Sequence, residues 1–116
     1  MRVEEVNTPA LILDMDRFRE NGQRMQHLME GSQARLRPHF KSHKCSRIAK
    51  LQMEAGAKGI TCAKLGEAEV LVEAGLPDIL IANQVVQPSK LAQLAYLARK
   101  ARITVCADDP VNIQEL

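Results

Sequence analysis

Apolar and polar positions along the chain follow two alternating patterns. Five short segments have the pattern of strands: residues 10–13, 35–41, 59–63, 78–82 and 103–107. Between them, apolar side chains recur every three or four positions, which predicts helices. Glycine and proline mark the helix boundaries, with Gly31, Gly56 and Gly75 following predicted helices and Pro88 and Pro110 opening them.

The predicted strands and helices form a repeat. The last four strands start near residues 35, 59, 78 and 102, a spacing of roughly 20 to 25 residues that suits one short βα unit. Repeated βα units form parallel sheets with right-handed crossovers. We therefore predict an α/β fold with parallel strands and about four βα units, arranged either as an open doubly wound sheet or as part of a (β/α)8 barrel.

Motifs remove support from one kind of open sheet, and length limits the other architecture to part of a barrel. Neither a Gly-x-Gly-x-x-Gly motif nor a P-loop motif follows any predicted strand, so the nucleotide-binding open sheets lose support. A complete barrel takes about 250 residues, whereas this chain has 116. We expect a partial (β/α)8 TIM-like barrel whose last strand has an open edge.

Composition indicates a folded, soluble protein. Hydrophobic residues make up 46% of the chain, and a net charge of +2 gives no electrostatic signature of nucleic-acid binding. Aromatic residues, which stack on bases, make up only 3%. Three widely spaced cysteines disfavour a disulfide framework and a CxxC zinc site. The sequence shows neither a signal peptide nor a membrane-length apolar run, so we expect a cytoplasmic protein that binds no nucleic acid and no membrane.

Residues 35–45 carry the candidate chemistry. Side chains alternate faces along a strand, so this segment should have an apolar face and a cationic face. No Asp or Glu lies between Gly31 and Met53, and an anionic ligand such as a phosphate is expected to balance the cations. The apolar face comprises Leu36, Pro38 and Phe40, and the cationic face comprises Arg37, His39, Lys41 and, if the strand extends that far, His43.

Lys41 lies at the carboxyl end of this predicted strand, where α/β folds place their ligands. Neighbouring positive groups favour the neutral form of its amine, and a neutral amine can attack an aldehyde to form a Schiff base. This chemistry suits a lysine that binds pyridoxal 5′-phosphate (PLP). A basic, solvent-facing edge strand is the alternative, which the spacing alone favours and which Pro38 supports because proline lacks a ladder donor.

Three further side chains near Lys41 have two interpretations each. His39, His43 and Cys45 have the residue types of a metal site, but their cationic surroundings favour structural or cofactor-proximal roles, so we predict no metal ligands here. His43 could act as an acid or base beside Lys41, or it could orient the residues that contact the cofactor without contacting it itself.

Polar residues in the later units are also candidates. Gln84 follows a predicted buried strand at its carboxyl end and could reach a cofactor there. Glu67 and Glu69 open a predicted helix, where a structural role at the helix dipole is the better hypothesis. Cys62 and Cys106 lie in predicted buried strands and are expected to be inert core thiols.

Four stretches of the chain resemble the D-threonine aldolase and D-serine dehydratase group of fold-type III PLP enzymes, which are relatives of alanine racemase. In order they cover nearly the whole chain, and the run R-P-H-x-K-x-H-K is the most diagnostic piece. The stretches are TPALILD at 8–14, RPHFKSHK at 37–44, Gly59 followed by CAKLGEAE at 62–69, and DILIANQ at 78–84.

The resemblance implies that Lys41 carries PLP as a Schiff base, and we place His39, His43 and Gln84 near the cofactor. It also implies a barrel whose C-terminal face holds the cofactor, followed by a β domain. Residues 1–116 would then be the N-terminal part of a PLP-binding alanine racemase-like barrel domain, with the C-terminal half-barrel and the β domain absent. Residues 10–13 could belong to that β domain instead of the barrel.

The same resemblance implies an activity. We expect a PLP-dependent carbon–carbon lyase that cleaves β-hydroxy-D-amino acids such as D-threonine to glycine and an aldehyde, inactive as these 116 residues alone. The family implies a homodimer for the full-length form, and a divalent metal such as manganese in the full-length enzyme only. Alternatives are D-serine dehydration, amino-acid racemisation, and a non-enzymatic PLP-binding or interaction module. A basic patch that binds phosphate or nucleic acid is a further one, formed by Arg35, Arg37, Lys41, Lys44, Arg47 and Lys50.

Overall fold

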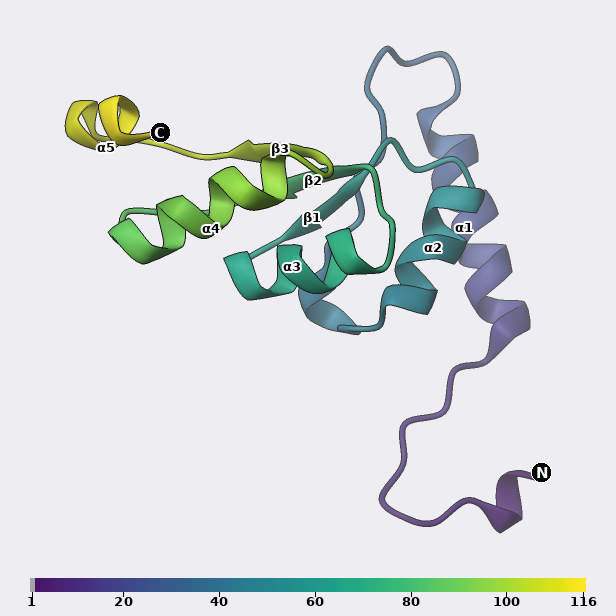
Figure 1. The fold of residues 1–116 in the computed structure, drawn as a ribbon. Helices are drawn as coiled ribbons and strands as arrows, with labels where there is room; N and C mark the ends of the chain where they lie inside the picture. The colour runs from purple at the N-terminus through teal and green to yellow at the C-terminus, as the bar shows by residue number, and fades with distance from the viewer. Residues whose placement is uncertain (1) are drawn as a thin grey trace.

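Three short parallel strands form the sheet at the centre of the computed structural model, which describes residues 2–116 and leaves Met1 outside (Figure 1). The strands are β1 (Ile60–Cys62), β2 (Asp78–Ile81) and β3 (Arg102–Val105), in that spatial order. Their register aligns Ile60 with Ile79, and Ile79 with Ile103. The sequence predicts each of these strands to within a few residues, and their parallel pairing confirms the α/β fold class.

Helices cover one face of the sheet. Helices α3 (Leu65–Glu73) and α4 (Pro88–Ala98) lie together on that face in Figure 1, and their buried leucines join the strand isoleucines in the core. The side chains that alternate with these isoleucines form a row across the opposite face. That row consists of Thr61, Leu80 and Thr104, and its exposure rises from buried Thr61 to exposed Thr104.

The remaining helices begin and end where local signals predict. Asp14 caps α1 (Met15–Met29) by accepting hydrogen bonds from the backbone N–H groups of Asp16 and Arg17, and Gly31 follows with φ +75°. Helix α2 (Ser46–Glu54) ends before Gly56, which has φ +99°, and Asp109 caps α5 (Pro110–Glu115). Two short 3-10 helices complete the chain, η1 (Val3–Glu5) and η2 (Phe40–Ser42).

Two predicted strands are wrong. Residues 10–13 are extended but exposed, with no pairing partner in residues 2–116, and Leu11 projects fully into solvent. Residues 35–41 run beside β1 but form only one isolated bridge, between His39 and Thr61, before the chain turns into η2. Pro38 has no N–H to donate to a ladder, which accounts for the interruption.

The third strand is less buried than its apolar sequence predicts. Arg102 and Thr104 are exposed, and Ile103 and Val105 are half-buried, because β3 is the edge of the sheet. Cys106 after it is exposed as well, so its expected place in the core is wrong.

The molecule is flat and open. Its principal extents are 53 × 42 × 22 Å and its radius of gyration is 16.7 Å, whereas a compact domain of this length has a radius of gyration of about 13 Å. The segment before α1 extends away from the body in Figure 1. Helix α5 lies beyond β3, where the buried Asn112 side chain donates to the Val85 carbonyl. None of the helices described between residues 2 and 116 is both long and apolar enough to cross a bilayer.

Candidate functional site

Lys41 lies in a tight turn at residues 40–44 (the Lys41 turn), not on a strand. It is the central residue of η2, and the Lys44 N–H closes the turn by donating to the Phe40 carbonyl at 2.8 Å. Phe40, 2% exposed, anchors the turn in the core, while Lys41 itself is exposed. Within residues 2–116 the Lys41 amine takes part in no ion pair or side-chain hydrogen bond. A buried anchor thus presents an unengaged amine at the carboxyl end of the segment that runs beside β1.

Two histidines brace this turn in the same way. The His39 Nδ1 accepts from the Lys41 backbone N–H at 3.2 Å, and the His43 Nδ1 accepts from the Cys45 backbone N–H at 3.2 Å. Each ring therefore accepts from the backbone N–H two positions ahead, one just before Lys41 in the chain and one just after it. Accepting at Nδ1 leaves the hydrogen of each neutral ring on Nε2. The structure brings the three predicted site residues of this segment together, with the histidines fixing the backbone around the lysine.

His43 extends inward from the turn. Its ring meets Phe40 edge-on, with ring centroids 5.4 Å apart. The His43 Nε2 and the Oε1 of Gln52 on α2 are both buried, and neither meets the distance and angle of a hydrogen bond. Nε2 is a donor and Oε1 is an acceptor, so the two atoms are complementary. Burial lowers the pKa of His43, and the Gln52 side chain acts in the opposite direction. Burial therefore favours the neutral ring, whose hydrogen lies on the buried Nε2 beside Gln52.

Backbone and side-chain bonds fix the segment before Lys41 against the sheet. The N–H groups of Lys58 and Thr61 donate to the carbonyls of Leu36 and Pro38, both at 2.8 Å. The Arg37 side chain crosses above Gly59 to reach Asp78 on β2, where Nη1 lies 2.8 Å from Oδ1. These contacts set the position of Lys41 without a regular ladder.

Asp78 also corrects the expected electrostatics. The sequence places no carboxylate near Arg37, yet Asp78, 41 residues later, neutralises it. The hydrogen bond from Arg37 holds the pKa of Asp78 below its ordinary value, against the effect of burial. Arg37 is therefore a structural cation, and the cationic face needs no anionic ligand at this position.

Gln84 lies farther along the same edge of the sheet. Its Nε2 donates to Asp108 Oδ2 at 2.9 Å, and its backbone N–H donates to Asn83 Oδ1 at 3.0 Å. Gln84 thus connects the carboxyl ends of β2 and β3, and within residues 2–116 it makes no hydrogen bond to the Lys41 turn. The structure places Gln84 at the predicted edge but engages its amide nitrogen with a neighbour.

Glu67 is the residue at this edge whose contacts the sequence does not reveal. Its Oε2 accepts from the Ala63 N–H at 2.9 Å, just after β1, and its Oε1 lies 3.6 Å from Lys44 Nζ. A helix-opening glutamate signals a local cap, whereas the pairing with Lys44 depends on how two loops meet in space.

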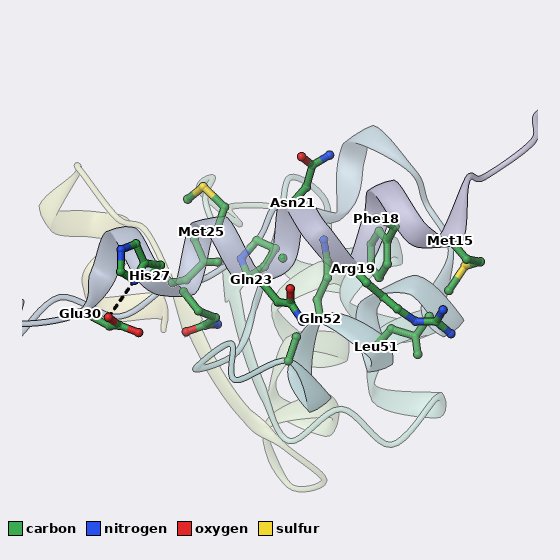
Figure 2. Close-up of a pocket in the computed structure, with 15 residues that line it drawn as sticks. Met15, Phe18, Arg19, Asn21, Gln23, Met25, His27, Glu30, Leu51 and Gln52 are labelled. Atoms are coloured by element: carbon green, nitrogen blue, oxygen red, sulfur yellow. Dashed lines mark ion pairs between the residues drawn. The ribbon is translucent and has the colours of Figure 1, made fainter.

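Two cavities accompany these features. The larger, about 780 Å³, lies between α1 and α2, and Figure 2 shows it lined by Phe18, Met25, Leu51 and Gln52, with the His27–Glu30 pair at one end. Lys41 does not line it. The smaller, about 580 Å³, lies at the carboxyl ends of β1 and β2, where α/β folds bind ligands. Its lining includes Lys44, Lys64, Glu67, Asn83, Gln84 and Lys90.

The cysteines differ in their surroundings. Cys62 is fully buried, which confirms its predicted place in the core. Burial, with a contribution from the Glu67 charge, raises the pKa of its thiol to about 11. Cys45 is half-buried and Cys106 exposed, and all three thiols are free. Between residues 2 and 116, no three His, Cys, Asp or Glu side chains gather as a metal site would require.

Comparison with known families decides the classification. The sequence profile described as "Alanine racemase, N-terminal domain" matches residues 13–116. The chain belongs to this family. The Lys41 turn, the sheet and the smaller cavity all lie within the matched residues of this alanine racemase N-terminal domain.

Known proteins resemble this alanine racemase N-terminal domain closely. A D-threonine aldolase from Arthrobacter sp is 47% identical over 111 residues, 96% of this chain and 29% of that protein. The crystal structure of D-threonine aldolase from Filomicrobium marinum is 51% identical, with a TM-score of 0.94, and the match covers 98% of this chain and 31% of that one. D-threo-3-hydroxyaspartate dehydratase from Delftia sp. HT23 is 38% identical, with a TM-score of 0.87, over 96% of this chain and 29% of that one. The expected resemblance is confirmed, and the chain spans less than a third of these relatives.

Proposed function

We propose that Lys41 is the residue through which the protein binds PLP. The observation that carries this proposal is the Lys41 turn: an exposed, unengaged amine fixed by buried Phe40 and two histidine caps at the carboxyl end of the sheet. Family membership supports it, because the alanine racemase N-terminal domain profile includes this turn.

The residues around Lys41 suit such a group. PLP supplies an electron sink for bond cleavage at the α-carbon of an amino acid. Lys41 would hold its aldehyde carbon, with half-buried His39 beside it. His43 would brace the turn by accepting from the Cys45 N–H at Nδ1 and would hold its proton at the buried Nε2. Gln84 would approach the cofactor from the carboxyl end of β2. Its Nε2 is bonded to Asp108, so its Oε1 would be the atom that is free to accept a hydrogen bond.

We propose aldol cleavage of a β-hydroxy-D-amino acid, such as D-threonine, as the reaction of the whole protein. The support is the 47% and 51% identity to two D-threonine aldolases. Residues 1–116 would supply the N-terminal part of the PLP-binding barrel domain, and the phosphate site, any divalent metal site and a β domain would come from outside them. A cytoplasmic homodimer acting on a small D-amino acid is the setting that the resemblance implies.

Dehydration is the second candidate, favoured by the TM-score of 0.87 to a D-threo-3-hydroxyaspartate dehydratase. The products separate the two reactions. Aldol cleavage of a β-hydroxy amino acid yields glycine and an aldehyde, whereas dehydration yields a 2-oxo acid and ammonia.

Reductive trapping tests the cofactor assignment directly. The purified protein is incubated with PLP, reduced with borohydride and digested, and the labelled peptide is identified by mass spectrometry. We expect the label on Lys41 and its loss in Lys41→Arg, which keeps the charge but not the reactive amine. Equal labelling of Lys41, Lys50 and Lys100, or no label in a folded sample, would overturn the assignment. Assays for glycine and for 2-oxo acid on D-threonine, made with the whole protein, then decide between the two reactions.

A further inference from the structure

Glu67 joins two loops at the carboxyl edge of the sheet. One is the turn that carries Lys41, which Glu67 reaches through Lys44; the other is the loop after β1, which it reaches through the Ala63 N–H. Its side chain is 12% exposed, so the carboxylate lies mostly within the protein and both oxygens are engaged. Glu67 therefore connects the residues just after Lys41 in the chain to the loop at the end of β1.

The backbone at Lys44 gives independent evidence that this attachment is under strain. Lys44 has φ +46°, the left-handed region, and no other non-glycine residue described in the structure has a positive φ. This conformation is unfavourable for a residue with a Cβ and persists only where surrounding contacts determine it. Here the Lys44 N–H is bonded to Phe40 and its ammonium is paired with Glu67.

The charge of Glu67 suits this role. Burial acts to raise the pKa of Glu67, but the Ala63 N–H and the Lys44 ammonium outweigh burial and hold the pKa below its ordinary value. The carboxylate is therefore ionised in the neutral range, where it attracts the ammonium of Lys44.

We propose that Glu67 is a positioning residue that acts through Lys44 to hold the Lys41 turn in the conformation that binds PLP. This inference rests on the proposed function of Lys41. Glu67 touches neither Lys41 nor, by this proposal, the cofactor; its effect passes through the backbone of residues 41–44.

A double-mutant cycle tests the coupling. Glu67→Gln removes the charge but keeps an oxygen for the Ala63 N–H, and Lys44→Gln removes the other partner at an exposed side chain. Each should weaken PLP binding about two- to fivefold, the range expected for a partly exposed ion pair, and should lower the share of borohydride-trapped label on Lys41. The double variant should be no worse than either single variant, because both remove the same contact.

Controls separate this inference from a general loss of stability. Glu73→Gln makes the same charge change at an exposed position of α3 and should bind PLP like the wild type. Circular dichroism checks that each variant is folded, and Lys44→Gln remains informative if Glu67→Gln does not fold. Unchanged binding and labelling in both single variants, with the wild type labelled on Lys41, overturns the role of Glu67 and leaves the proposed function intact. A wild type without label on Lys41 overturns both.

Discussion

At the scale of single residues, the neutral ring of His43 makes stability depend on pH. Burial lowers the pKa of His43, so on acidification the unfolded chain binds a proton near pH 6.5, before the folded chain does. The free energy of unfolding should therefore fall as the pH drops below about 6.5 and level off below the pKa of the folded state. Protonation also removes the Nδ1 acceptor that caps Cys45.

His43→Asn isolates this contribution. The Asn side chain can accept from a backbone N–H two residues ahead, but it does not titrate. Urea unfolding at pH 7.5 and pH 5.5 should show a larger loss of stability in the wild type than in the variant. Identical pH profiles for the two proteins would contradict a lowered pKa of the half-buried His43 ring.

Residues of the candidate site differ in how far the sequence predicts them. Lys41 is predicted by motif and by its place in the repeat. The alternation of His39, Lys41 and His43 on one strand face is not observed, because the chain turns into η2 after His39. The partners of Arg37 and Lys44, namely Asp78 and Glu67, come from later βα units. Such contacts depend on the folded arrangement and leave no local signal.

At the scale of elements, helices follow from the sequence more closely than strands. Helix signals are local, as the Asp14 cap and the left-handed Gly31 show. A strand needs a partner to supply its hydrogen bonds, so the apolar residues 10–13 remain unpaired within the described chain. The segment at 35–41 has β1 as a neighbour, but Pro38 breaks the ladder.

Gly59 is required by the contact that fixes the segment before Lys41. A Cβ at this position would collide with the Arg37 guanidinium and lie 2.6 Å from the Asp78 carbonyl. We expect Gly59→Ala to destabilise the protein by about 1–3 kcal/mol through overpacking, measured as the free energy of unfolding in urea. Gly22→Ala is the matched control, because nothing lies within 4 Å of its Cβ position in α1 and alanine favours helices. Equal effects of the two substitutions would show that Arg37 does not cross above Gly59.

At the scale of the whole molecule, the flat shape leaves the sheet accessible at its β3 edge and at the adjoining part of one face. The row of Thr61, Leu80 and Thr104 faces away from α3 and α4, and the outer edge of β3 has no strand beside it in residues 2–116. An exposed strand edge offers unpaired backbone groups to a second chain. Apolar side chains are also exposed around the open sheet, among them Val86, Val111 and Ile113.

This openness predicts that the 116-residue chain associates with itself through β3. A lysine on an edge strand opposes such pairing, because the lysines of the two copies would lie on neighbouring strands of one sheet and repel each other. Thr104→Lys should raise the dissociation constant of the dimer about tenfold, equivalent to about 1.4 kcal/mol, as measured by sedimentation velocity over a range of concentrations. Thr8→Lys adds the same charge to the exposed segment before α1 and should leave the association unchanged. A monomeric wild type would contradict the association, and the short, twisted edge would then protect itself. Equal effects of the two lysines would place the association elsewhere than β3.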